Sequence, residues 1–140
     1  MAIQQLSVFV ENQKGKLLGT VKTLADAGIN IRAMSIADTK DFGILRMITS
    51  DNAKTKEVLS DNTVVNTTEV IAVKMADTPG ALYKVMDILS SAGVNIEYLY
   101  AFTASDALGA YVVFRVDDVP HAQKLMDDNG LQSLQENDLN

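Results

Sequence analysis

The stretch ADTPGALYKVMDILSSAGVNI, at Ala76–Ile96, decides the fold because the chain contains it twice. The other copy, ENQKGKLLGTVKTLADAGINI, lies sixty-five residues earlier at Glu11–Ile31. Seven of the twenty positions that start at Asn12 and at Asp77 are identical, with no gap. Each copy consists of a turn with glycine, an amphipathic helix, a glycine that ends the helix, and an asparagine shortly after it. A repeat this long indicates two copies of a small domain.

The two halves follow the same order of elements. Leu6, Val8 and Val10 alternate with residues of the opposite face and predict the first strand. In the first half we expect further strands over 31–36, 44–49 and from 64 onward, with helices over 16–27 and 52–59, the second capped by Asp51 or Asn52. The first half also has a predicted turn at 39–43, and a linker at 66–69 leads to the second half. There we expect strands over 71–75, 96–102, 111–116 and 131–134, with a turn at 103–109. We expect helices over 81–92 and from the N-cap Asp117 up to Gly130, and a frayed tail at 135–140.

Strand–helix–strand–strand–helix–strand is the order of a ferredoxin-like sandwich. The sequence therefore predicts an α+β protein with two such domains, residues 1–67 and 68–140, each with both helices on one face of a four-stranded antiparallel sheet. The helix stripes expected to face the cores are Leu17, Leu18, Val21, Leu24 and Ala25, then Leu82, Val85, Met86, Leu89 and Ala92, and finally Val119, Ala122, Leu125 and Met126. Domains this small bury little surface alone, so we expect the halves to pack on each other or on a second chain.

Composition argues against several function classes. The net charge is −6 and no lysine or arginine run occurs, so a nucleic-acid surface is disfavoured. The chain has no cysteine, a single histidine at His121, no cluster with metal-ligand spacing and no phosphate-binding glycine motif. We therefore expect no cofactor, no metal and no catalytic residue. With no secretory signal and no apolar run of membrane-spanning length, we expect a soluble, cytoplasmic protein that does not bind membranes.

The repeated turn and asparagine suggest a small-ligand site. A glycine lets the backbone approach a ligand, free amides at a helix N-terminus suit a carboxylate, and an asparagine amide both donates and accepts. Together they match the charged groups of a free amino acid. A structural explanation is equally available. Asn12 or Asp77 would be a helix cap or an Asx-turn residue, Gly28 and Gly93 would be helix stops, and Asn30 and Asn95 would only follow a left-handed cap. A duplicated fold would also duplicate its structural residues.

The two halves each resemble an ACT domain, the ferredoxin-like module that binds amino acids in regulated biosynthetic enzymes. The resemblance rests on Asp77-Thr78-Pro79-Gly80-Ala81-Leu82 with Gly93-Val94-Asn95-Ile96. The first half is especially similar to the regulatory subunit of acetolactate synthase, through Val10-Glu11-Asn12-Gln13 and Gly28-Ile29-Asn30-Ile31. The family implies that two domains pair through their second strands into an eight-stranded sheet, with the effector held in the seam between them.

Carried over by position, the resemblance implies two sites. One would combine Asn12, Gly15, Lys16 and Leu17 with Asn95, and the other Asp77, Gly80, Ala81 and Leu82 with Asn30. Three departures from the family pattern stand out: Lys14 replaces a proline, Asp77 replaces an asparagine, and Val10 and Met75 occupy the place of a histidine that some relatives have. The two sites need not be equivalent.

These observations predict a non-enzymatic sensor that stands alone, binds a free amino acid and regulates a partner enzyme of amino-acid metabolism. We expect a homodimer that associates through the sheet face presenting Tyr98 and Tyr100. The alternatives are a regulatory subunit of an acetolactate-synthase-like enzyme, an adaptor that binds no ligand, and an acylphosphatase-like hydrolase. The last would need an arginine in the first loop, whereas Arg32, Arg46 and Arg115 fall in predicted strands.

Overall fold

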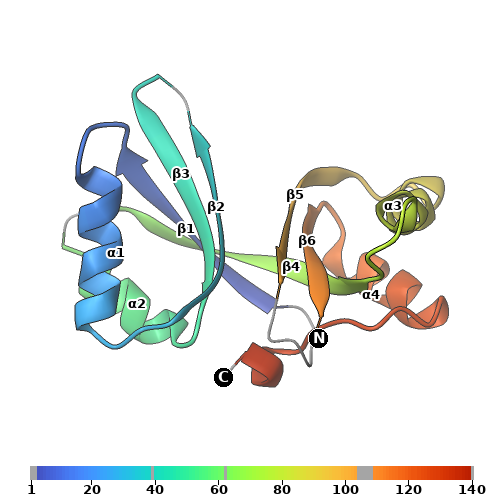
Figure 1. Ribbon diagram of the computed structural model, residues 1–140. Helices are drawn as coiled ribbons and strands as arrows, with labels where there is room; N and C mark the ends of the chain where they lie inside the picture. Colours follow the sequence, from blue (N-terminus) through green and yellow to red (C-terminus); the bar gives the residue numbers. More distant parts are fainter. Residues whose placement is uncertain (1–2, 39, 62, 104–108, 140) are drawn as a thin grey trace. The chain divides into compact units, whose positions relative to one another are not determined.

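The computed structural model describes residues 3–38, 40–61, 63–103 and 109–139. Figure 1 shows the order of the elements along the chain. They are β1 (Ile3–Glu11), α1 (Lys16–Asp26), β2 (Ile31–Asp38), β3 (Phe42–Thr49), α2 (Asn52–Leu59), β4 (Val65–Met75), α3 (Ala81–Ser91), β5 (Ile96–Thr103), β6 (Ala110–Val116), α4 (Val119–Asp128) and a 3-10 helix, η1 (Glu136–Leu139). The longest helices have 11 residues, and no described helix is long and apolar enough to cross a membrane.

Apart from the chain ends, Gln4–Thr68 form one compact unit and Glu69–Asp138 the other. We call them the first and the second unit. The strand β4 crosses the boundary between them without a break. The expected linker at 66–69 is therefore wrong: these residues are strand. Two of them are threonines, whose branched side chains suit a strand despite their polarity.

The first unit has the full strand order of a ferredoxin-like sheet, and the second unit has three of its four strands. In the first unit the order is β4-β1-β3-β2, with Leu6 opposite Met47 and Met47 opposite Met34 in antiparallel register. In the second unit β4 pairs with β6 and β6 with β5, also antiparallel. The expected strand over 131–134 is reduced to one bridge, between Val73 and Ser133. The hydrogen-bonded strands follow the order β2-β3-β1-β4-β6-β5, which gives six strands. The expected eight-stranded pairing stays a prediction.

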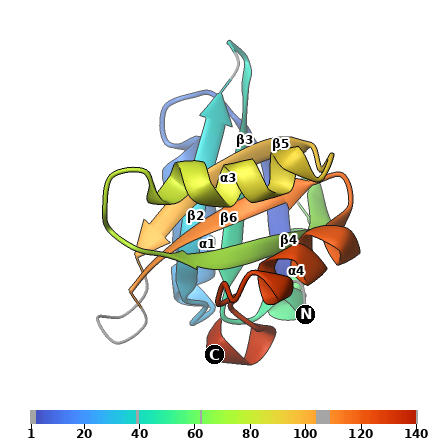
Figure 2. The same cartoon turned by 90° about the vertical axis from the view of Figure 1, so that its right-hand side faces the viewer.

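In each unit, helices cover one face of the sheet. Figure 2 shows α3 and α4 covering the sheet of the second unit. The first core contains Leu6, Val8, Val10, Leu24, Ile29, Leu45, Met47 and Leu59. The second contains Ile71, Val73, Val85, Leu89, Val94, Val112, Phe114, Val116, Val119, Ala122 and Met126.

The predicted helix stripes need correction. On α1 only Leu24 is buried, Ala25 is exposed, and Leu18 is 72% exposed. On α3, Val85 and Leu89 are buried but Ala92 is exposed. The predicted stripe was wider than the surface each short helix buries, because one helix of 11 residues contacts the sheet along a narrow line.

Four further expectations need correction or fall outside the described residues. Asp118, not Asp117, caps α4, and its side chain accepts from the His121 N–H. Tyr100 is only 8% exposed, so it is not presented on an open sheet face. The tail is not simply frayed, since it contains η1. Of the two predicted turns, residues 39 and 104–108 lie outside the described part. Asp51 caps α2, as one of the two predicted alternatives.

Gly15 and Gly19 provide a matched test of backbone strain. Gly15 has φ +84°, where a side chain is strained, whereas Gly19 lies within α1, where an added methyl group would meet only open space. We expect Gly15→Ala to lower the free energy of unfolding by about 1–2 kcal/mol and Gly19→Ala to raise it by up to about 1 kcal/mol. Urea denaturation of both variants measures this, and equal effects would contradict the assigned backbone conformations.

Tyr111 predicts an alkaline weakening of the fold. Its ring is fully buried and stacks on Phe102, and its hydroxyl has no partner among the described residues. Burial, and secondarily the Asp138 carboxylate, raise the pKa of Tyr111 above 10.0. A group whose pKa is higher in the folded than in the unfolded state contributes its full stabilisation at pH values below the unfolded-state pKa. This contribution is lost as the pH rises through the folded-state pKa.

We therefore expect the free energy of unfolding to fall above about pH 10, and to fall less in Tyr111→Phe. Near neutral pH the variant should be as stable as the parent or gain up to about 1 kcal/mol, because an unpartnered buried hydroxyl is removed. Urea titrations at about pH 8 and about pH 10.5 test this. The same alkaline loss in both proteins would assign it to other groups.

Candidate functional site

The loops before α1 and α3 have the same backbone geometry. Gly15 and Gly80 precede the helices with φ +84° and +87°, and neither helix has a side-chain cap. The cap explanation for Asn12 and Asp77 is therefore wrong; the Asn12 amide instead donates to the Lys40 carbonyl at 3.4 Å. Helix geometry leaves the first-turn N–H groups without intrahelical acceptors. The N–H groups of Lys16 and Ala81, directly after the glycines, donate to the Gln13 and Thr78 carbonyls, both at 3.2 Å. The donors left for an anionic group are therefore those of the next residues in each first turn.

Asn30 and Asn95 are fixed through their backbones. The Asn30 N–H donates to the Ser50 hydroxyl at 3.0 Å, and the Asn95 N–H donates to the Asp117 carboxylate at 2.9 Å. Their carbonyls accept from the Ser50 and Asp117 N–H groups at 2.9 and 3.2 Å. Both asparagines are exposed, and neither side-chain amide bonds to any described residue. The backbone is held while the amide is available to a ligand.

The loop and the asparagine of one unit do not form a site together. They flank the 11 residues of α1 or α3, which span about 16 Å at 1.5 Å per residue. A small ligand that contacts both features must therefore use the loop of one domain and the asparagine of another. The two-domain sites, with Lys16, Leu17, Ala81 and Leu82 at the helix starts, stay a prediction.

The two loops differ in charge. The first carries Lys14 and Lys16, both exposed, whereas the second carries Asp77 and no cation between Ala76 and Ala81. A carboxylate is attracted to the first loop and repelled by Asp77, while an ammonium has the opposite preference. The loops therefore present non-equivalent surfaces on equivalent backbones.

Features of metal and phosphate chemistry are not assembled in the described residues. No group of three or more His, Asp or Glu side chains there has a metal-binding arrangement. The three arginines lie in β2, β3 and β6, as predicted. Arg115 donates to the Glu69 carbonyl at 2.9 Å and lies 3.5 Å from the Glu97 carboxylate. No arginine is thus placed in either loop to hold a phosphate.

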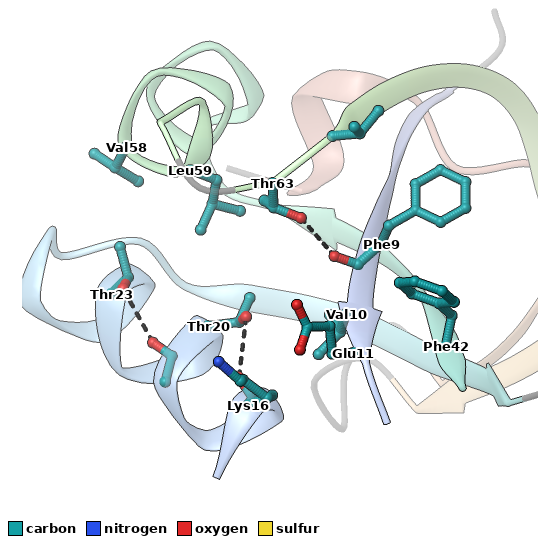
Figure 3. A pocket seen from close by; sticks show the side chains of 12 residues that line it. Phe9, Val10, Glu11, Lys16, Thr20, Thr23, Phe42, Val58, Leu59 and Thr63 are labelled. Atoms are coloured by element: carbon teal, nitrogen blue, oxygen red, sulfur yellow. Dashed lines mark hydrogen bonds between the residues drawn. The ribbon is translucent and has the colours of Figure 1, made fainter. Parts of the chain in front are cut away.

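Sequence reasoning missed a cavity of about 500 Å³ inside the first unit. Figure 3 shows Lys16, Thr20 and Thr23 of α1 on one side, and Val58, Leu59 and Thr63 on the other. Its other lining residues are Phe9, Val10, Glu11, Gly19, Phe42 and Val64. The only signal in the sequence was a pair of hydroxyls, Thr20 and Thr23, where the second copy has Val85 and Ile88.

Two ferredoxin-like units in one chain, each with the same glycine turn and the same asparagine, are typical of proteins with a tandem repeat of one small domain. The whole chain, residues 1–140, matches the family described as the ACT domain pair, and it belongs to that family. The expectation of ACT domains is confirmed, whereas the finer resemblance to the acetolactate synthase regulatory subunit is not.

Solved structures agree with this assignment. Protein BT0572 from Bacteroides thetaiotaomicron is 39% identical, with a TM-score of 0.91 over 99% of this chain and 96% of that one. The aspartate kinase regulatory subunit of Thermus thermophilus, in its ligand-free form, shares the fold at 16% identity and a TM-score of 0.64, covering 89% and 91%. That of Thermus flavus does so at 16% identity and a TM-score of 0.61, covering 91% and 90%. No curated protein matches the chain.

Asp117 provides a test of how the asparagine is held. Asp117→Ala removes the acceptor of the Asn95 N–H, so we expect faster exchange of that amide proton and a loss of about 1 kcal/mol in the free energy of unfolding. Native-state hydrogen exchange read residue by residue measures the effect. The control is Asp87→Ala, an exposed carboxylate in α3 of the same unit; Asn95 exchange that matches the control would contradict the role of Asp117.

Proposed function

We propose that this ACT domain pair is a non-catalytic sensor that binds a free amino acid between two ACT domains and regulates a partner enzyme of amino-acid metabolism. One observation carries the proposal: an exposed glycine turn and an asparagine with an available amide occur twice, with the same backbone geometry. The fold shared with aspartate kinase regulatory subunits supports a regulatory role. The sites are those of the family pattern, with loop and asparagine from different domains.

The charges of an amino acid suit this arrangement. Its carboxylate accepts from the first-turn N–H groups of α1 or α3 that follow Lys16 or Ala81. Its ammonium and carboxylate both find partners on an asparagine amide, which offers a donor and an acceptor. Leu17 and Leu82, both half-buried, favour a small or branched aliphatic side chain. The cationic first loop favours the carboxylate more strongly than the second, so the two sites have different affinities.

The pairing of domains requires free sheet edges. Among the described residues, β2 pairs with β3 and β5 pairs with β6. The strands β2 and β5 stand at the two ends of the strand order. An edge strand is a template for a strand from another chain. We therefore propose a homodimer, in which the second strands of two chains pair side by side and complete the sites.

Regulation follows if the bound ligand favours one arrangement of the loops. Leu18 and Tyr83 occupy equivalent positions beside the two loops and are 72% and 71% exposed. Large apolar side chains this exposed fit a surface that another protein covers. A ligand that orders the loops changes this surface, and the partner enzyme responds to the difference. One specific version of this proposal is a regulatory subunit of an acetolactate-synthase-like enzyme.

The ligand prediction is tested by thermal-shift measurements with each of the twenty amino acids. We expect one amino acid, or a few related ones, to raise the melting temperature, because a ligand of the folded state stabilises it by mass action. The double variant Asn30→Ala/Asn95→Ala should lose at least tenfold in affinity (about 1.4 kcal/mol) if the asparagines hold the ligand. A flat response to all twenty would support the adaptor alternative instead.

The dimer prediction is tested by light scattering during size-exclusion chromatography. We expect twice the chain mass of 15.2 kDa. Ser35→Pro, in the edge strand β2, removes a backbone donor and should shift the protein toward monomer. Ala53→Ser, an exposed change in α2, is the control. A monomer in the parent protein at all concentrations would contradict the proposed pairing.

A further inference from the structure

The α1 side of the cavity in the first unit differs in composition from the equivalent positions of the second copy. The helices α1 and α3 are equivalent, sixty-five residues apart and equal in length. Val85, at the position of Thr20, is 5% exposed and belongs to the second core, and Ile88, at the position of Thr23, packs against it. The replacements from the first to the second copy are Glu11 to Ala76, Lys16 to Ala81, Gly19 to Lys84, Thr20 to Val85 and Thr23 to Ile88. At two of these positions, those of Thr20 and Thr23, the second copy thus has apolar side chains packed in its core, and at the positions of Glu11 and Lys16 it has uncharged alanines.

The wall opposite α1 is fixed in place. The helix α2 has 8 residues where α4 has 10, and Thr63 and Val64 of the following segment complete the cavity. The Thr63 hydroxyl donates to the Phe9 carbonyl, and the Phe9 N–H donates to the Val64 carbonyl at 3.2 Å. These bonds join the rim to β1, so the cavity belongs to the fold of the first unit.

The polar groups of the cavity offer acceptors and both signs of charge. The hydroxyls of Thr20 and Thr23 donate to carbonyls of their own helix, at 3.3 and 3.0 Å. Because their protons are used within the helix, these oxygens can serve a ligand only as acceptors. The Lys16 ammonium and the Glu11 carboxylate form no ion pair with any described residue, and Figure 3 shows the carboxylate directed from β1 toward α1.

The remaining lining is apolar. Val10 and Leu59 are each 5% exposed, and Val58 is half-buried beside them. A ligand for this cavity needs an apolar part for these side chains and a polar part with both charges. A simple anion meets the Glu11 carboxylate and a simple cation meets the Lys16 ammonium, whereas a zwitterion satisfies both.

We propose that the cavity of the first unit, which we call the cleft because it lies between α1 and α2, binds an aliphatic α-amino acid within a single domain. Lys16 holds the carboxylate, Glu11 and the threonine oxygens hold the ammonium, and the aliphatic side chain lies on Val10, Val58 and Leu59. This inference rests on the proposed function, that of an amino-acid sensor, and places a site inside the first unit, separate from the predicted two-domain sites.

The experiment is isothermal titration of the full chain with L-leucine, L-isoleucine and L-valine. We expect at least one of them to bind. Two analogues of L-leucine, 4-methylpentanoate without the ammonium and isopentylamine without the carboxylate, should bind at least tenfold more weakly. Equal binding of either analogue would overturn the zwitterion assignment.

Variants separate the cleft from the two-domain sites. Thr20→Val/Thr23→Ile introduces the residues of the second copy and should weaken binding at least tenfold while the fold is retained. Glu11→Gln, an exposed change, should do the same by removing the partner of the ammonium, whereas Glu57→Gln on α2 is the matched control. Lys16 contributes to both kinds of site and is left unchanged.

The outcomes distinguish the two proposals. Binding lost in the cleft variants but kept in Asn30→Ala/Asn95→Ala supports the cleft. Binding lost only in the asparagine variant overturns the cleft and leaves the proposed function standing. Binding restricted to amino acids with charged side chains also overturns the cleft alone, and no binding of any of the twenty overturns both.

Discussion

The hydrogen-bond ladders of β4 are the constraint on which both units depend. This strand neighbours β1 in the first unit and β6 in the second, and no linker interrupts it. Val65 packs against the first core, whereas Ile71 and Val73 belong to the second. Because side chains alternate along a strand, a slip of one residue would turn these apolar side chains away from both cores. A single strand therefore contributes apolar side chains to the core of each unit.

The repeat predicted much of the fold, since spacing identifies α1 and α3 and alternation identifies most strands. The repeat failed to predict features that depend on contacts with distant parts of the chain. The polar residues before Val70 resembled a linker, because hydrogen bonding to neighbouring strands leaves no hydrophobic pattern. The sequence predicted Asp117 as the last N-cap, but Asp118 caps α4 and the Asp117 carboxylate accepts from the Asn95 N–H, a contact between distant segments. The cavity escaped prediction because its walls come from distant segments, α1 and Thr63–Val64.

The two copies share the same backbone geometry at the loop and at the asparagine, whereas the side chains around them differ. A left-handed glycine precedes each first helix, and a side-chain oxygen at the end of the third strand of each unit holds the asparagine N–H. That oxygen is a hydroxyl in Ser50 and a carboxylate in Asp117, so the geometry persists while the residue type differs. The charge of the loops and the lining between the helices have diverged instead. The duplicated scaffold therefore carries two surfaces that differ in charge and in polarity.

A loop without a side-chain cap is well suited to respond to a ligand. The first-turn N–H groups of α1 and α3 have no capping side chain, so a bound carboxylate adds hydrogen bonds without breaking any within the helix. A ligand shifts a conformational equilibrium only by its difference in affinity between the two states. In the proposed function, a ligand that orders the loop would supply such a difference. Leu18 and Tyr83 lie in the same first turns with exposed side chains, so a partner that covers them would respond to this ordering.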